Sequence, residues 1–231
     1  MTLLWLYQMM LLVVIGVLLP VMAVRNSADT RHILQQRPGL RATFYQQGAI
    51  MQWFLVALIL VAQWWQGGGL SAIGWSTALS WHFWLSMSGL VMVSILTWKL
   101  YCPGPMVGAW LVRLYSHVAH YLPVDTRSYS WGVVMAVTAG ICEELIYRGL
   151  LYHLLIQWIP DWSGMILANV VFAVTHYSTG WVNAAGAFVL GLLFSWLYWL
   201  TGDLWLSMWL HAAIDLLAVT LYPLAVRNKP S

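Results

Sequence analysis

Charged side chains are scarce in this chain. Only 7% of its 231 residues are Asp, Glu, Lys or Arg, whereas 61% are hydrophobic. Soluble domains carry about 25% charged residues, so a water-soluble fold would lack the side chains needed to cover its surface. The composition excludes a soluble globular protein and predicts an all-α polytopic membrane protein.

Cysteine is nearly absent as well. The two cysteines are Cys102 and Cys142, and Cys142 lies inside an apolar run, so we expect no disulfide. The net charge of +3 comes from basic loops, which membrane topology explains better than nucleic-acid binding does. Because the sequence has no internal repeat and no low-complexity segment, residues 1–231 are predicted to form a single transmembrane domain.

Apolar runs predict about seven membrane-spanning helices. A polar stretch at 25–47, which contains a Pro-Gly turn, follows the first run, and a later connector is expected to hold an interfacial helix over 109–122. The predicted spans cover residues 3–24, 50–65, 81–98, 131–153, 163–177, 183–200 and 204–221.

The positions of Lys and Arg favour an odd number of spans. With the N-terminus outside and seven spans, nine of the ten basic residues fall on one side of the membrane, and the tenth, Arg148, lies within a span. The positive-inside rule predicts this asymmetry, with a cytoplasmic C-terminus. The nine residues are Arg25, Arg31, Arg37, Arg41, Lys99, Arg113, Arg127, Arg227 and Lys229.

Two carboxylates and one guanidinium interrupt the fourth predicted span, at Glu143, Glu144 and Arg148. Each ionisable group in a spanning helix costs roughly 2.5–3.5 kcal/mol on insertion scales, so such groups mark functional sites by default. Glu144 and Arg148 are four residues apart and share a helix face, where they can pair. Glu143 is rotated by about 100° from Glu144, so we expect one anchored and one free carboxylate.

Two further polar groups lie in the apolar C-terminal half. Phe172 and His176 are four residues apart in the fifth predicted span, with Asn169 about two turns before the histidine, and His211 and Asp215 are four apart in the seventh. Isolated polar groups would be costly there, whereas converging ones can satisfy one another. The bland alternative is a buried stabilising network with no chemistry.

The pattern Glu-Glu-x-x-x-Arg, Phe-x-x-x-His and His-x-x-x-Asp on successive segments resembles the CAAX prenyl endopeptidase and bacteriocin-processing intramembrane protease family, also called CPBP or Abi. The resemblance covers about two-fifths of the chain, and it implies a catalytic core at 130–222 after N-terminal spans and a connector at 1–129. Many members have Asn where this chain has Asp215. The resemblance implies a bacterial member, in the cytoplasmic membrane.

The family resemblance implies hydrolysis of a peptide bond by a glutamate-activated water, without a cofactor. Such a reaction needs a base and donors for the oxyanion. Glu143 is the candidate base, and His176 is expected to orient the water. We expect a neutral His211 to donate to the oxyanion, while Asp215 donates if it is protonated and otherwise orients His211.

The remaining polar positions are expected to support the site. The Glu144–Arg148 pair would act as an electrostatic brace, because a paired carboxylate is a poor base. Phe172 would pack or form the wall of a substrate pocket, and Asn169 would stand behind the residues that contact substrate. The expected partners are the lipid bilayer and a membrane protein or peptide as substrate, with no nucleic acid.

Three alternatives stay open. Glu143, His176 and His211 can supply a three-ligand zinc site, although the chain lacks His-Glu-x-x-His. Chained Glu, His and Asp groups also serve proton-linked transporters, although no broken spans in matched halves are seen. The third alternative is a non-catalytic immunity or scaffold protein of the membrane. Neither the substrate nor the oligomeric state follows from the sequence.

Overall fold

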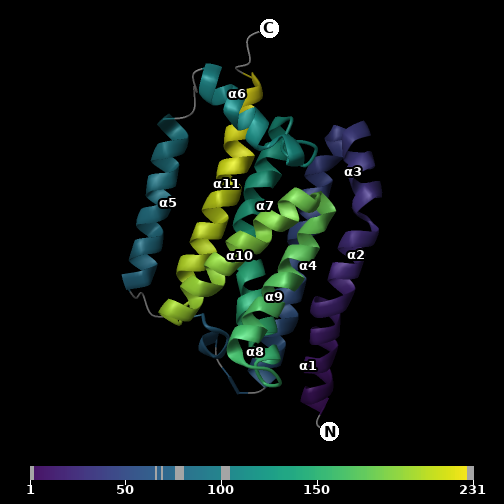
Figure 1. The fold of residues 1–231 in the computed structure, drawn as a ribbon, viewed down its shortest axis with the longest axis vertical. Coiled ribbons are helices and arrows are strands. Elements are labelled where there is room, and N and C mark those ends of the chain that lie inside the picture. Colours follow the sequence, from purple (N-terminus) through teal and green to yellow (C-terminus); the bar gives the residue numbers. More distant parts are fainter. Residues whose placement is uncertain (1–2, 66, 69, 76–80, 100–104, 228–231) are drawn as a thin grey trace.

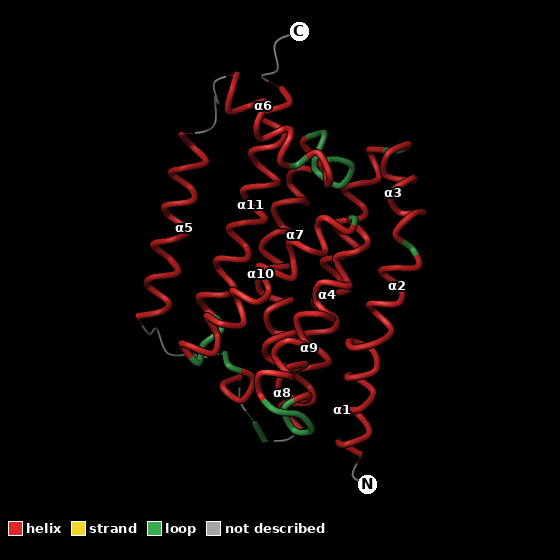
Figure 2. The backbone as a smooth tube through the Cα atoms, viewed as in Figure 1, coloured by secondary structure: helices red, strands yellow, loops and turns green. Residues whose placement is uncertain are grey.

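The computed structural model describes residues 3–65, 67–68, 70–75, 81–99 and 105–227. Every regular element in these ranges is a helix (Figure 2), which confirms the all-α prediction for this part of the chain. Cys142 is buried and free, and Cys102 lies outside the described residues.

Helix α7 (Thr126–Glu144) lies at the centre of the bundle, where it packs against α4 (Arg41–Trp65) and α11 (Trp205–Arg227). Helices α9 (Asp161–Thr175) and α10 (Trp181–Thr201) pack against each other. These five helices surround the polar motifs, and the largest buried apolar cluster lies beside them, including Leu145, Phe172 and Met208.

The remaining long helices flank this bundle (Figure 1). On one side, α5 (Trp81–Lys99) packs against α11. On the other side, α1 (Leu3–Val13) and α2 (Leu19–Arg25) contact α4 and α9, respectively. The two chain ends lie at opposite ends of the molecule (Figure 1).

Two wide, π-helical turns interrupt the helices. The first, Val14–Leu18, comes just before Pro20, whose missing N–H and bulky ring disturb regular α-helical bonding. The second, Leu145–Leu151, directly follows the two glutamates and leads into α8 (Tyr152–Leu155). Such turns occur frequently at functional sites. Here the second one carries Arg148.

Four described helical stretches are long and apolar enough to cross a membrane: Leu3–Arg25, Pro38–Trp65, Trp181–Thr201 and Trp205–Val226. Large apolar side chains cover their outer faces; Trp64 and Trp199, for example, are 83% and 68% exposed. A surface of this kind suits lipid. The chain is a membrane protein, while the number of seven spans and the orientation of the termini stay predictions.

Two sequence expectations about the connecting segments were wrong. The polar stretch at 25–47 contains α3 (Ser27–Gln36), and α4 begins at Arg41, whereas the second span was predicted to begin at residue 50. Buried Arg41 explains the early start, because its Nη1 donates to the carbonyl of Leu122 and so has an acceptor inside the fold.

The second error concerns the expected interfacial helix over 109–122. The helix found there, α6, spans Pro105–Leu114 and is followed by a short 3₁₀ turn, Ser116–Val118. The Ser116 hydroxyl donates to the carbonyl of Arg113, a local bond that competes with helix continuation.

Candidate active site

Three elements bring the polar motifs together. Glu143 and Glu144 end α7, His176 begins the 3₁₀ turn His176–Thr179 after α9, and His211 lies in α11. Gly140 sets the approach of α7 to α11, since a Cβ there would lie 2.6 Å from the backbone nitrogen of Ala212 and 2.7 Å from the carbonyl oxygen of Met208. A small residue at this crossing lets the backbones touch and places the glutamates beside His211.

Glu143 has one occupied and one free carboxylate oxygen. Its Oε1 accepts a hydrogen bond of 2.6 Å from Nε2 of Gln52 in α4. Its Oε2 is buried without a hydrogen-bond partner among the described residues, yet it lies 3.7 Å from Nε2 of His176 and 3.8 Å from Nε2 of His211. Separations of this size exceed a direct hydrogen bond and suit a bridging water.

The acceptors beside the two histidines determine their tautomers. Nδ1 of His176 donates to the carbonyl of Phe172 at 2.9 Å, so a neutral His176 presents an unprotonated Nε2 to Glu143. Nδ1 of His211 donates to Oε1 of Glu144 at 2.9 Å. A neutral His211 with its proton on Nδ1 has none on Nε2, so in this tautomer the expected donation to an oxyanion requires the doubly protonated imidazole.

The predicted pair between Glu144 and Arg148 is present and buried. Nη1 of Arg148 lies 3.0 Å from Oε1 of Glu144, and both side chains are at most 3% exposed. Nη2 donates to Oδ1 of Asn169 at 2.8 Å and to the carbonyl of Gly191 at 2.9 Å, while Nε donates to Ser195. A buried guanidinium with this many acceptors is fixed in place.

Aromatic rings pack around the charged groups. The ring of Phe172 lies 4.5 Å from the guanidinium carbon of Arg148, and Phe194 stacks on His211 with ring centres 5.0 Å apart. Phe172 also contacts the rings of His176 and His211. This packing fits the expected wall role of Phe172 and limits rotation of both imidazoles.

Asn169 and Asp215 lie at different depths. Asn169 is buried in the Arg148 network, where its Oδ1 accepts from Nη2 of Arg148 and its Nδ2 donates to Ser195. The side chain of Asp215 is 39% exposed, and its Oδ2 lies 3.7 Å from Nε2 of His211. Asp215 therefore stands at the rim of the cluster and Asn169 behind it.

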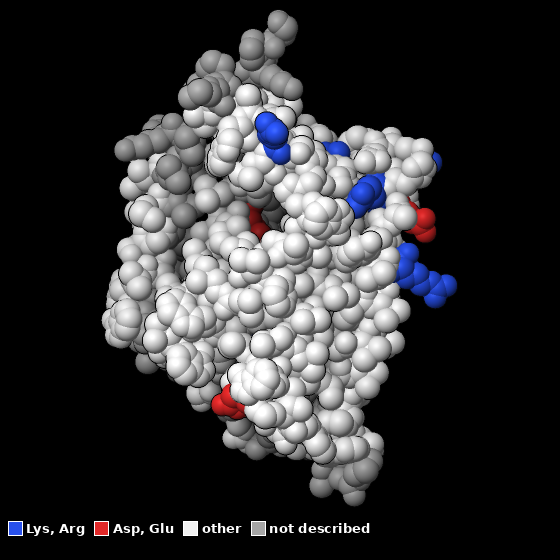
Figure 3. Space-filling view, viewed as in Figure 1, with Lys and Arg blue, Asp and Glu red and all other residues white. Residues whose placement is uncertain are grey.

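Two cavities meet at His176. The α4-side cavity has a volume of about 430 Å³, and its lining includes Met22, Met51, Gln52, Met135, Glu143 and His176. The α11-side cavity has a volume of about 400 Å³, and its lining includes Tyr115, Phe172, His176, Gly186, His211 and Asp215. On the face drawn in Figure 3, an acidic side chain is visible at the bottom of a hollow, and the basic side chains gather near one end. The cluster thus has space on both sides.

Comparison with known protein families gives one match. Residues 125–217 match the family model described as type II CAAX prenyl endopeptidase Rce1-like. These residues belong to the CAAX prenyl endopeptidase family. The matched segment, called the CAAX-protease domain below, contains Glu143, Glu144, Arg148, His176, His211 and Asp215. No curated protein and no solved structure matched the chain.

The CAAX-protease domain does not contain every residue of the site. Gln52 lies outside the matched segment and was missed in the sequence, because it belongs to none of the three motifs. A polar amide in the apolar run 50–65 was the available signal. Ser195 and Gly191 were also missed, since a hydroxyl and a backbone carbonyl in a helix carry no motif.

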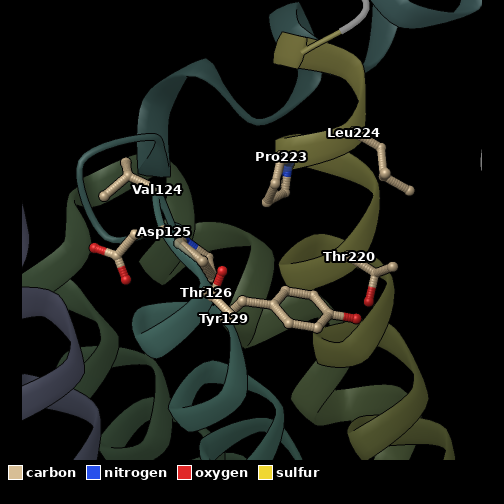
Figure 4. Close-up of a pocket in the computed structure, with 8 residues that line it drawn as sticks. Val124, Asp125, Thr126, Tyr129, Thr220, Pro223 and Leu224 are labelled. Atoms are coloured by element: carbon tan, nitrogen blue, oxygen red, sulfur yellow. The ribbon is translucent and has the colours of Figure 1, made fainter.

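A third cavity of about 240 Å³ lies at the beginning of the CAAX-protease domain (Figure 4). Asp125 and Tyr129 approach it from the start of α7, and Thr220 and Pro223 approach it from α11. The carboxylate of Asp125 accepts a 2.7 Å bond from the backbone N–H of Ser128 and caps α7, and this bond holds the pKa of that carboxyl below its usual value. Capping of α7 therefore explains why the carboxylate of Asp125 lies at this cavity.

The CAAX-protease domain also contains side chains of the kinds that bind metal ions. Among the described residues, no group of three or more His, Cys, Asp and Glu side chains meets the geometric criteria for holding a metal ion. The Nε2 atoms of His176 and His211 nevertheless both face Oε2 of Glu143, as stated above.

Proposed function

We propose that the chain is an intramembrane endopeptidase that hydrolyses a peptide bond of a membrane-associated protein or peptide, with Glu143 as the base. One observation carries this proposal: a free carboxylate oxygen of Glu143 faces two imidazole nitrogens at the point where two cavities meet. Membership of the matched segment in a protease family supports it. The two cavities leave space for an extended peptide on either side of the carboxylate.

In the proposed reaction, Glu143 and His176 bind one water between them. Oε2 of Glu143 takes a proton from the water as the water oxygen attacks the carbonyl carbon of the substrate. The carbonyl oxygen becomes an oxyanion. Glu143 then delivers the proton to the amide nitrogen, the carbon–nitrogen bond breaks, and the carbonyl re-forms as a carboxylic acid with release of the amine.

The oxyanion is proposed to lie on the α11 side. Protonated Nε2 of His211 supplies the donor there, and the carboxylate of Glu144 beside Nδ1 offsets the positive charge of that imidazole. Arg148 holds Glu144 in turn, so the pair acts through His211 rather than on the substrate. Oε1 of Glu144 is bonded to both Arg148 and His211, whereas its Oε2 is buried without a hydrogen-bond partner among the described residues. Because a carboxylate paired with a guanidinium is a poor base, Glu143 is the better candidate.

The decisive experiment compares Glu143→Gln with Glu144→Gln. Because the substrate is unidentified, membrane proteomes of cells carrying the parent chain or each variant are compared for new peptide termini. We expect Glu143→Gln to remove the termini that the parent produces while the purified variant keeps the parent's melting temperature (Tm). Unchanged cleavage by stably folded Glu143→Gln protein would overturn the proposal.

A chelator distinguishes this mechanism from the zinc alternative. That alternative is tested because Glu143, His176 and His211 converge. Purified protein is incubated with 1,10-phenanthroline or EDTA and assayed on a cleaved peptide identified by the proteome comparison. We expect the parent protein to keep full activity after chelation. Added Zn²⁺ should not restore activity to the Glu143→Gln variant. Loss of activity on chelation that Zn²⁺ restores would favour the metal mechanism.

We further infer that the basic end of the molecule faces the cytoplasm, as the positive-inside rule directs. Buried Arg41 aside, the arginines at positions 25, 31, 113 and 127 lie in or beside the segments that join the helices at this end. Cysteines introduced singly at Arg31 and Arg113 should resist a membrane-impermeant maleimide in intact cells and react after lysis. Labelling of both in intact cells would reverse the orientation.

A further inference from the structure

Gln52 connects the N-terminal half of the chain to the candidate base. It lies in α4, outside the matched segment 125–217, and its amide Nε2 donates to Oε1 of Glu143 at 2.6 Å. The contact joins residues that are 91 positions apart in the chain. Helix α4 packs along α7, so the donor is held by a helix–helix contact.

The hydrogen bond restricts how the carboxylate of Glu143 can point. A glutamate side chain has three rotatable bonds, and here it lines a cavity of about 430 Å³ in which few neighbours would stop it from turning. With Oε1 held by Gln52, Oε2 is the oxygen that lies 3.7 Å and 3.8 Å from the two imidazoles. Without that donor, neither oxygen is fixed toward the histidines.

We propose that Gln52 is a positioning residue of the active site, which holds Oε1 of Glu143 so that Oε2 faces the space between His176 and His211. This inference rests on the proposed role of Glu143 as the base. Displacement of a reacting group by about 1 Å can cost on the order of 100-fold in rate. The active site is therefore incomplete without α4.

The test replaces Gln52 by Met, which has similar length and no donor. The matched control is Gln47→Met, an exposed position on the same helix. With the peptide found in the proteome comparison, we expect kcat of Gln52→Met to fall roughly 10- to 100-fold, with KM within about twofold of the parent. The Gln47→Met control should keep both constants.

Two outcomes would overturn the inference. Unchanged kcat in folded Gln52→Met protein would show that Glu143 needs no support from α4. A raised KM with unchanged kcat would show that Gln52 is only a wall of the α4-side cavity. If Gln52→Met does not fold, Gln52→Glu replaces it, because the carboxylate keeps the shape and polarity but accepts where the amide donates; it too should lose kcat.

The same assay separates this inference from the proposed function. If Glu143→Gln is inactive and Gln52→Met is fully active, the inference fails and the role of Glu143 stands. If Glu143→Gln is fully active, the proposed mechanism fails first. Tm and gel-filtration profiles of every variant establish that equal amounts of folded protein are compared.

Discussion

The α4-side and α11-side cavities bring different chemistry to the histidine that they share. The α4-side cavity contributes a carboxylate and an amide among flexible Met22, Met51 and Met135. The α11-side cavity contributes an imidazole and a second carboxylate among the rings of Tyr115, Phe172 and Phe194. Methionine adapts to varied shapes, whereas aromatic walls are rigid.

The two cavities are also lined by different parts of the chain. Most residues that line the α4-side cavity lie in or beside α2, α3 and α4, which precede the matched segment. In the α11-side cavity, His211, Asp215 and Phe172 lie within that segment. The matched segment therefore supplies most of the lining of the α11-side cavity, and the N-terminal helices supply much of the lining of the α4-side cavity. The two cavities can thus vary independently in sequence.

Loss of the shared residue should have the largest effect. His176→Ala removes the group that both cavities have in common and that is proposed to bind the attacking water together with Glu143. Holding a reactant in place supplies about 7–11 kcal/mol of the barrier in favourable cases. We expect kcat to fall by at least about 1000-fold at unchanged Tm, measured with purified protein on the identified peptide. A loss below about tenfold would mean that the two cavities do not act together through His176.

Filling one cavity at a time should sharpen the contrast. Gly48 lines the α4-side cavity, where an added Cβ would approach only the flexible end of Met135, and Gly186 lines the α11-side cavity, where an added Cβ meets nothing within 4 Å. We expect Gly48→Leu and Gly186→Leu each to lower kcat/KM roughly tenfold, by steric exclusion.

A peptide library reads out where each filled cavity acts. Gly48→Leu should change the residue preference on one side of the cleaved bond, and Gly186→Leu should change it on the other side. Both substitutions replace a helical glycine, so their effects on helix propensity cancel in the comparison. If the two variants altered preference on the same side, the division between the cavities would be wrong.

A smaller effect is expected at Asp215. Its carboxylate lies 3.7 Å from Nε2 of His211, where a negative charge opposes an oxyanion in the α11-side cavity. An amide keeps the size and removes that charge, so Asp215→Asn should raise kcat at neutral pH by roughly two- to tenfold. A fall of more than tenfold would instead show that the charge of Asp215 is needed to hold His211.

How far the sequence predicts this site depends on the kind of residue. Glu143, His176 and His211 are ionisable groups in apolar runs, so their cost in a membrane reveals them, and the structure brings them together. Gln52 and Gly191 act through an amide and a backbone carbonyl, which carry no such signal. The tautomer of His211 depends on its contact with Glu144, a partner 67 positions away.

The fold shows a similar division. Hydropathy locates the long helices, but it misplaces the start of α4, because Arg41 and Tyr45 are buried and donate to carbonyls of the segment that precedes α7. In a short stretch of sequence, hydropathy does not distinguish Arg41 and Tyr45 from residues of a polar loop. Only the tertiary partner shows why the helix continues through them.

The smallest effect should come from the third cavity, which serves as a control for the other two. Asp125→Ala removes the cap of α7 and should cost about 1 kcal/mol of stability, seen as a lower Tm, with kcat unchanged. Since folding lowers the pKa of this carboxyl, its contribution is present at neutral pH and is lost as the pH falls through the lowered value.

The Tm difference between Asp125→Ala and the parent should therefore shrink in strongly acidic buffer. A changed kcat in this variant would extend the active site to the third cavity and end its use as a control. A difference in Tm that grew as the pH fell would contradict the sign of the pKa shift.

The contact at Gly140 has a consequence for biosynthesis. Glu143 and His176 precede His211 in the chain, and the two carboxylates meet that imidazole only after α11 has docked where Gly140 leaves its backbone bare. A nascent chain that lacks α11 therefore has the two glutamates without the imidazole of His211. The polar cluster becomes complete only when the last helix docks against α7.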